Sequence, residues 1–123
     1  MNIEQYTSLG FDEAKRREEF FNNCSRHIDH AREKHPFFAN GVLEDSEQGN
    51  VLDEVVTLEM ARYYKRKIAK SPVLENVLLS EIYEFLAELH KGNMERALEE
   101  ACDVVAVLYR AHAGDMDEKG GVQ

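Results

Sequence analysis

The short turn Lys91-Gly92-Asn93 constrains the fold most, because it separates two segments whose apolar residues recur at helical spacing. Gly92 is a typical residue beyond a helix C-terminus, and Asn93 is a typical helix N-cap. The sequence therefore predicts one helix over residues 72–91 and another from residue 94 to about residue 113. Helices joined by so short a connection must run antiparallel and lie side by side.

Two earlier helices are also expected. Asp12 can cap the first, which should end near Lys34 because residues that precede a proline avoid helical geometry. A second helix is expected over residues 50–70, with cations at its end that suit the helix dipole, and Ser71 can cap the third helix. Because no segment alternates polar and apolar residues as a strand would, the predicted class is all-α, a four-helix bundle.

The length of 123 residues fits one domain with its own core. We expect a single domain over residues 1–123, in which residues 1–10 and 114–123 are flexible.

The formal net charge of −9 argues against nucleic-acid binding, which needs a basic surface. The chain has no apolar run near the ~18 residues that a membrane helix requires, and no signal-peptide pattern. Two cysteines make no disulfide framework, so a cytoplasmic location is expected.

The apolar pattern also predicts which helix faces form the core. In the second helix these residues are Val51, Val55, Leu58 and Ala69, with the stem of Arg62. The fourth helix is apolar around most of its surface beyond Asp103, which is typical of a central helix. Its main apolar arc comprises Met94, Ala97, Leu98, Ala101, Val105 and Leu108. Four helices leave much of this surface uncovered, so association with a second copy is expected.

Carboxylates are concentrated on both sides of the turn. Between Glu81 and Asp103 the chain has seven acids and two bases. Glu81, Glu84 and Glu88 form a stripe along one predicted helix, and Glu100 and Asp103 lie one turn apart on the next. Because these two helices are expected to be antiparallel neighbours, the pair Glu81 and Glu84 can face the pair Glu100 and Asp103.

Two interpretations account for carboxylates on such apolar helices. The acids can be exposed at the edge of the bundle or paired with lysine and arginine side chains. Alternatively, a bound cation offsets the cost of burying four converging carboxylates, which is several kcal/mol for each unpaired group. Oxygen ligands without histidine or cysteine select Mg²⁺, or Mn²⁺ in its place.

The doubled acidic motif resembles that of a known superfamily. Glu81-Ile82-Tyr83-Glu84 is followed, after fifteen residues, by Glu100-Ala101-Cys102-Asp103, with the flanks LLSEIYEFLAEL and EEACDVVAVLYR. This pattern is similar to that of the all-α nucleoside triphosphate pyrophosphohydrolases, which include the MazG proteins, the dimeric dUTPases and phosphoribosyl-ATP pyrophosphohydrolase. The chain looks most like the small MazG-like proteins, over residues 72–112. Asn93 departs from the pattern, because many members have aspartate there, but no metal ligand is lost.

The resemblance implies a function. Glu81, Glu84, Glu100 and Asp103 would hold Mg²⁺, or Mn²⁺, on the triphosphate, and the catalytic residue Glu81 or Glu84 would accept the proton of the attacking water. Attack at the α-phosphorus would yield a nucleoside monophosphate and pyrophosphate, which is the reaction of a nucleotide-pool house-cleaning enzyme. Members of the superfamily are helical bundles that dimerise, so a homodimer or a dimer of dimers is implied.

Three residues are candidate substrate contacts. Lys67 and Arg110 can contact phosphates, and the resemblance implies that His27, on the first helix, helps to line the pocket for the base. Glu59 can pair with Arg62 or Arg66 or reach the metal region, and Glu88 is expected at the surface or beside the ligands. Two alternatives to the leading hypothesis stay open. One is a phosphoribosyl-ATP pyrophosphohydrolase-like enzyme with the same metal chemistry. The other is a non-enzymatic helical dimerisation or partner-binding module whose acids are solvated.

Overall fold

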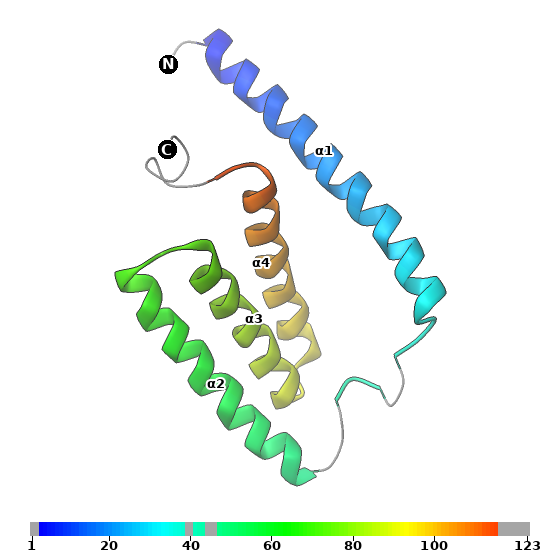
Figure 1. Cartoon of the computed structure of the whole chain (residues 1–123), viewed down its shortest axis with the longest axis vertical. Coiled ribbons are helices and arrows are strands. Elements are labelled where there is room, and N and C mark those ends of the chain that lie inside the picture. Colours follow the sequence, from blue (N-terminus) through cyan, green and yellow to red (C-terminus); the bar gives the residue numbers. More distant parts are fainter. Residues whose placement is uncertain (1–2, 39–40, 44–46, 116–123) are drawn as a thin grey trace. The chain divides into compact units, whose positions relative to one another are not determined.

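The computed structural model describes the backbone of residues 3–38, 41–43 and 47–115, and the side chains of residues 12–38, 41–43 and 52–115. These residues form four α-helices and no strand, which confirms the predicted all-α class (Figure 1). The chain divides into two compact units, residues 1–38 and 39–123, so the single domain stays a prediction. From residue 116 onward, the expected flexible tail lies outside the described residues. None of the described helices is long and apolar enough to cross a membrane.

The first unit contains α1, Ile3–Lys34. The predicted end near Lys34 is confirmed, but the helix begins well before Asp12, which therefore lies inside α1 and does not cap it. Residues 3–10, expected as a flexible lead-in, are helical. The helix continues through Gly10, since one interior glycine costs a helix only about 1 kcal/mol.

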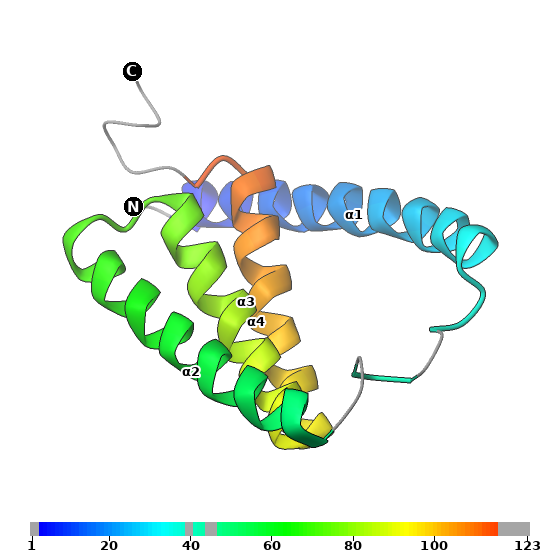
Figure 2. The same ribbon diagram turned by 60° about the horizontal axis from the view of Figure 1, so that its bottom comes forward.

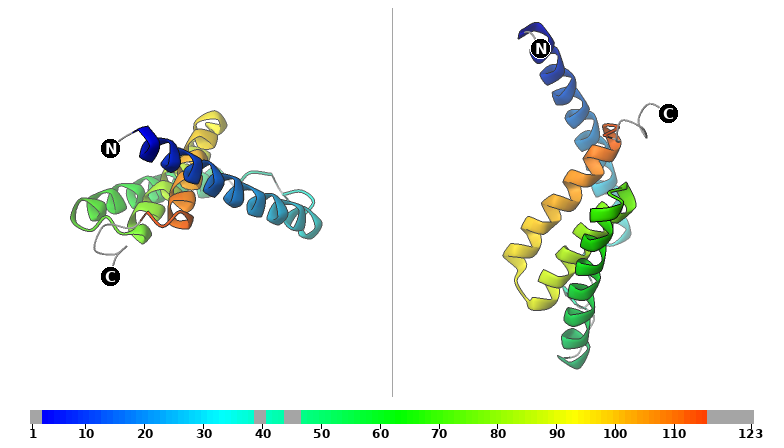
Figure 3. Two further views of the ribbon diagram at one scale, coloured as in Figure 1. Left: turned by 90° about the horizontal axis from the view of Figure 1, so that it is seen from above. Right: turned by 90° about the vertical axis from the view of Figure 1, so that its left-hand side faces the viewer.

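The second unit contains α2, Glu47–Lys70, α3, Leu74–Lys91, and α4, Met94–His112. Successive helices run antiparallel, and α3 lies between the other two (Figures 1 and 2). The right-hand view of Figure 3 shows the same order from the side. α3 packs against both neighbours, whereas the backbones of α2 and α4, over their described parts, do not approach each other closely. A side chain on α3 therefore has a neighbouring helix on two sides.

The turn between α3 and α4 forms as predicted. Gly92 adopts a left-handed conformation with φ 80°, and its N–H donates to the Leu89 carbonyl at 3.0 Å. A residue with a Cβ pays about 1–2 kcal/mol in this conformation, which explains the glycine. The side-chain oxygen of Asn93 accepts a hydrogen bond from the Arg96 N–H at 3.1 Å. Both predicted capping roles are confirmed.

The junction between α2 and α3 differs from the prediction. The expected cap Ser71 instead continues the last turn of α2, because its N–H donates to the Lys67 carbonyl at 2.8 Å. Val73 occupies the N-cap position of α3 and has no side-chain capping bond. The buried Asn76 side chain donates to the Ser71 carbonyl at 2.9 Å. This bond, rather than a serine cap, ties the first turn of α3 to the end of α2.

Small side chains form the most buried contacts of the second unit. Ser80 and Ala87 on α3 are 2% and 3% exposed, and they lie on one stripe of the helix because they are seven residues apart. Ala97 on α4 is fully buried, and Ala61 on α2 is also buried. Small residues at helix contacts let the helix axes approach closely. Longer side chains beside this stripe on α3 are therefore held between helices.

The apolar surface of α4 divides into two stripes. Ala97 and Val107 are buried, and Glu100 lies half-buried between them on the stripe that packs on α3. The other stripe, hereafter the outer stripe, is exposed in the single chain and comprises Met94, Leu98, Val105 and Leu108. The predicted apolar arc is therefore wrong as a core face, since Ala97 is its one buried member. The helix with neighbours on both sides is α3, not α4.

The buried face of α2 is also rotated from the predicted one. Thr57 and Ala61 are buried, and the Thr57 hydroxyl donates to the Asp53 carbonyl at 2.7 Å, so its polar group is satisfied. Leu58 is half-buried, and Val51 lies outside the described side chains. The remaining predicted core residues are exposed, namely Val55, Arg62 and Ala69.

Candidate metal centre

Glu81 and Glu84 lie one turn apart on α3, directly after the buried Ser80. Both residues are half-buried, and the side chain of Glu84 is 23% exposed. The central position of α3 explains this burial, because α2 and α4 cover it from two sides. Two like charges one turn apart repel each other, and partial removal of water strengthens that repulsion.

α4 adds a third carboxylate. Glu100 belongs to the stripe that packs on α3, and its side chain is 17% exposed. One carboxylate oxygen from each of Glu81, Glu84 and Glu100 lies within 4.8 Å of the others. These three residues are hereafter the acidic cluster. They are three of the four predicted metal ligands, and they come from both helices of the predicted hairpin.

The fourth predicted ligand, Asp103, is placed differently. Its side chain is exposed, and its oxygens are not among the three that converge. Its charge nevertheless helps to raise the pKa of both Glu81 and Glu100, so Asp103 lies near the acidic cluster. A role for Asp103 as a metal ligand stays a prediction.

Glu81 carries the largest electrostatic cost of this arrangement. Burial, together with the charges of Glu84, Asp103 and Glu100, raises the pKa of Glu81 to about 7. Burial and the charge of Glu84 also raise the pKa of Glu100. The Oε2 atom of Glu81 is buried and has no hydrogen-bond donor in the described part of the protein. A hydrogen bond between Glu81 and Glu84 is possible only while one of the two carboxyl groups is protonated.

Two basic side chains pair with members of the cluster. The Lys65 Nζ atom on α2 lies 3.1 Å from Glu84 Oε1, and the Arg96 Nη2 atom on α4 lies 3.8 Å from Glu100 Oε1. Both bases are more than half exposed, so water screens these pairs. No ion pair among the described residues involves Glu81. Pairing with lysine and arginine therefore accounts for two of the three acids and leaves Glu81 unexplained.

The donor set of the cluster fits a hard divalent cation. All three side chains offer carboxylate oxygens, which Mg²⁺ and Mn²⁺ prefer. Glu81 has a buried oxygen, Oε2, without a hydrogen-bond partner in the described part of the protein, and a cation held by this residue would offset the cost of its burial. Among the residues with described side chains, no histidine or cysteine joins the group, so the set does not suit a zinc site.

The three predicted substrate contacts have different settings. The Arg110 Nε atom pairs with Asp115 Oδ2 at 3.1 Å, at the end of α4. The Lys67 Nζ atom lies over two tyrosine rings, 5.4 Å from the Tyr63 centroid and 5.5 Å from the Tyr64 centroid. His27 is exposed on α1, in the first unit. A role for these three residues in substrate binding stays a prediction.

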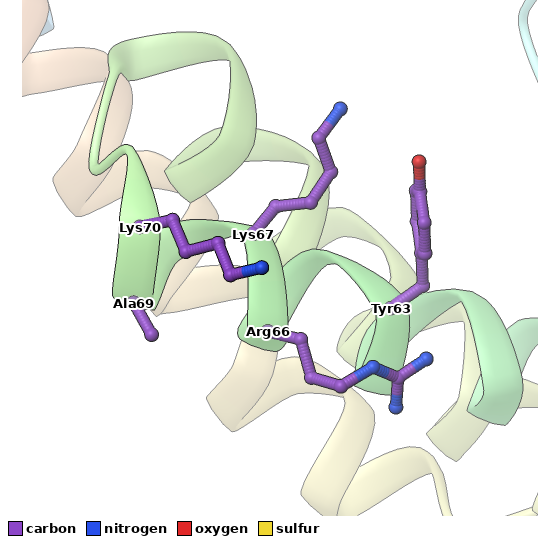
Figure 4. Close-up of a pocket in the computed structure, with 5 residues that line it drawn as sticks. All are labelled: Tyr63, Arg66, Lys67, Ala69 and Lys70. Carbon is purple, nitrogen blue, oxygen red and sulfur yellow. The ribbon is translucent and has the colours of Figure 1, made fainter.

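A pocket of about 480 Å³ lies along the C-terminal part of α2. Figure 4 shows the residues that line it, Tyr63, Arg66, Lys67, Ala69 and Lys70. All five come from one helix, so the pocket is an open depression of the surface rather than an enclosed site. Three of them are basic, and their positive charges would favour an anion there without selecting a particular one.

Sequence reasoning missed Lys65, because its neighbours depend on how α2 and α3 are aligned. The rings of Tyr64 and Tyr83 stack with centroids 5.8 Å apart and an interplanar angle of 6°. Each tyrosine directly precedes one member of the Lys65–Glu84 pair, so this stack and the ion pair belong to one alignment of the helices. A pattern of apolar residues along α2 cannot reveal that alignment.

The settings of two further acidic residues, Glu59 and Glu88, were also predicted. Glu59 pairs with Arg62 at 2.8 Å, which selects one of the three settings predicted for it. Glu88 is half-buried, with its side chain 16% exposed, and pairs with Lys91 at 3.6 Å. Glu88 is therefore more enclosed than a surface residue, and a local ion pair satisfies it.

No protein-family model matches the chain, and comparisons with curated proteins and with solved structures also give no match. The resemblance carried by the doubled acidic motif therefore stays a prediction. The physical support for a function comes from the acidic cluster and its surroundings.

The metal-free protein should lose stability as the pH rises from about 4.5 to about 7. The pKa of Glu81 is about 7 in the folded chain and near 4.5 for an ordinary glutamate in the unfolded chain, so the folded state binds more protons in this window. Stabilisation from the protonated group is complete below about pH 4.5 and is lost as the pH rises through about 7. In EDTA, the urea concentration at the unfolding midpoint should therefore fall as the pH is raised from about 4.5 to about 7.

Glu81→Gln should reduce this fall, because the amide does not titrate. Glu99→Gln, which removes an exposed charge on α4, should retain it. The explanation would be wrong if Glu81→Gln followed the same pH profile as the unmodified chain.

Proposed function

We propose that this chain is a Mg²⁺-dependent nucleoside triphosphate pyrophosphohydrolase in which Glu81, Glu84 and Glu100 hold the metal ion. Two observations carry the proposal: one oxygen from each of three carboxylates lies within 4.8 Å of the others, and Glu81 has a buried oxygen without a hydrogen-bond partner among the described residues. Among the residues that the structure describes, surface pairing supplies partners for Glu84 and Glu100 but not for Glu81. A divalent cation would supply the missing positive charge to all three acids.

The chemistry of a triphosphate substrate agrees with such a site. Phosphates would be repelled by the acidic cluster alone, so substrate binding here requires a cation between the two. A bound Mg²⁺ or Mn²⁺ ion offsets the phosphate charge and lowers the pKa of water. Glu81 or Glu84 would accept the proton of the attacking water, as the resemblance implies. Cleavage between the α and β phosphates would then release a nucleoside monophosphate and pyrophosphate, in a house-cleaning role.

We also propose that a second copy of the chain covers the outer stripe of α4. Leu98, Val105 and Leu108 are 59%, 40% and 42% exposed, and they follow the heptad-like spacing of helices that pack together. Leu98→Glu should convert the dimer to a monomer, as measured by light scattering, because it buries a charge at the contact. Val42→Glu, at an exposed apolar residue outside the helices, should not. A monomeric unmodified chain would contradict this part of the proposal.

Pyrophosphate release tests the enzymatic proposal directly. The protein should release pyrophosphate from at least one member of a panel of ribonucleoside and deoxyribonucleoside triphosphates in the presence of Mg²⁺. EDTA should abolish the release, and Mg²⁺ or Mn²⁺ should restore it. Phosphoribosyl-ATP belongs in the panel, since its cleavage alone would select the alternative enzyme. Silence across the panel from folded protein would favour the non-enzymatic module, for which the outer stripe would be the binding surface.

Glu100→Gln should lower kcat/KM by about a hundredfold or more, because the cluster loses a charged ligand. The same change should weaken the rise in melting temperature that Mn²⁺ produces. Glu99→Gln is the matched control, since it removes the same charge from the adjacent, exposed residue of α4. Its kcat/KM should stay within about twofold of the original value. Equal losses in both variants would show that overall charge, and not a ligand at residue 100, supports activity.

A further inference from the structure

Lys65 is the basic side chain that α2 contributes to the surroundings of the acidic cluster. Its Nζ atom lies 3.1 Å from Glu84 Oε1. The hydrogen bond to Glu84 raises the pKa of Lys65, and the charges of Glu84, Glu81 and Glu100 act in the same direction. The ammonium group is thus attracted by all three acids of the proposed metal site, although it contacts only one.

We propose that Lys65 is an internal counter-cation of the acidic cluster, which a divalent cation displaces from Glu84 when it binds. This inference rests on the proposed metal site and deepens it, because it assigns to Lys65 control over the affinity of that site. Lys65 then serves the metal-free protein by offsetting part of the repulsion among Glu81, Glu84 and Glu100.

The exposure of the two partners supports displacement rather than a permanent contact. The Lys65 side chain is 70% exposed, whereas that of Glu84 is 23% exposed. The lysine is therefore held by charge at the edge of the cluster, and its flexible stem can carry the ammonium group into water. Glu84, in contrast, is confined beside α2 and α4 and keeps its place when the lysine leaves.

Competition follows from the charge of the two cations. A divalent ion that shares Glu84 with the other two acids would lie close to the Lys65 ammonium group, and like charges at such distances repel. Metal binding must then displace Lys65, so the metal-free ion pair lowers the apparent affinity for the metal. The rings of Tyr64 and Tyr83, the residues just before Lys65 and Glu84, stack on each other. This contact between α2 and α3 holds Lys65 opposite Glu84.

The test uses Lys65→Met, which keeps most of the stem and removes the charge. Mn²⁺ alone is the probe, and titration calorimetry on the full chain measures its Kd. The Kd should fall about twofold to fivefold, which is the range expected for loss of one exposed ion pair. In EDTA the melting temperature of Lys65→Met should drop, and the rise produced by a fixed Mn²⁺ concentration should be larger than in the unmodified chain.

Lys70→Met is the control for overall charge. Lys70 is exposed on the same helix and makes no ion pair among the described residues, so its removal should leave the Kd for Mn²⁺ within about 1.5-fold at physiological ionic strength. An equal tightening in both variants would overturn the proposal, because charge anywhere on α2 would then suffice.

The remaining outcomes separate this inference from the proposed function. If the unmodified chain binds Mn²⁺ and Lys65→Met leaves the Kd unchanged or raises it, the counter-cation role is wrong and the metal site stands. If neither protein binds Mn²⁺, both the metal site and the role of Lys65 are wrong. If only Lys65→Met binds measurably, the ammonium group blocks the site and the proposal is supported in its strongest form.

Discussion

The packing of α3 against both α2 and α4 is the contact on which the second unit depends. Small residues at its closest points, Ser80 and Ala87 on α3 and Ala97 on α4, permit the helix axes to approach each other. That approach encloses the residues beside them, including Glu81 and Glu84. Burial of charge in this unit is therefore a consequence of helix packing, and any change that separates the helices would return the acids to water.

The acidic cluster works against the stability of the metal-free fold. Its three carboxylates converge within 4.8 Å, and burial with mutual repulsion raises the pKa of Glu81 to about 7. Lys65 and Arg96 offset part of the repulsion from exposed positions, where water weakens ion pairs. A fold with no use for these acids would gain by replacing Glu81 with an apolar residue. Local costs of this kind are characteristic of functional sites, which is the general argument for a bound cation here.

Local rules predicted the parts of this protein that depend on local sequence. The helical class, the Gly92 terminator and the Asn93 cap each follow from a few neighbouring residues, and each is confirmed. The short turn also predicted that acids of α3 and α4 would meet, and three of the four do.

The buried faces of α2 and α4 depend instead on helix rotation. One residue corresponds to about 100° around a helix, so Ala97 is buried while the larger Leu98 is exposed. The pairing of Lys65 with Glu84 requires the alignment of two whole helices, which no local pattern contains.

The two stripes of α4 connect the proposed metal site to the proposed self-association. The stripe that packs on α3 buries Ala97 and Val107 and carries Glu100, so few apolar atoms hold this acid in place within one chain. Cover over Leu98, Val105 and Leu108 would add apolar burial on an adjacent face of the same helix, at about 25 cal/mol per Å². A second copy would then restrict the motion of α4 and with it the position of Glu100. By linkage, a cation that binds Glu100 would in turn favour the dimer, since both events stabilise one arrangement of α4 against α3.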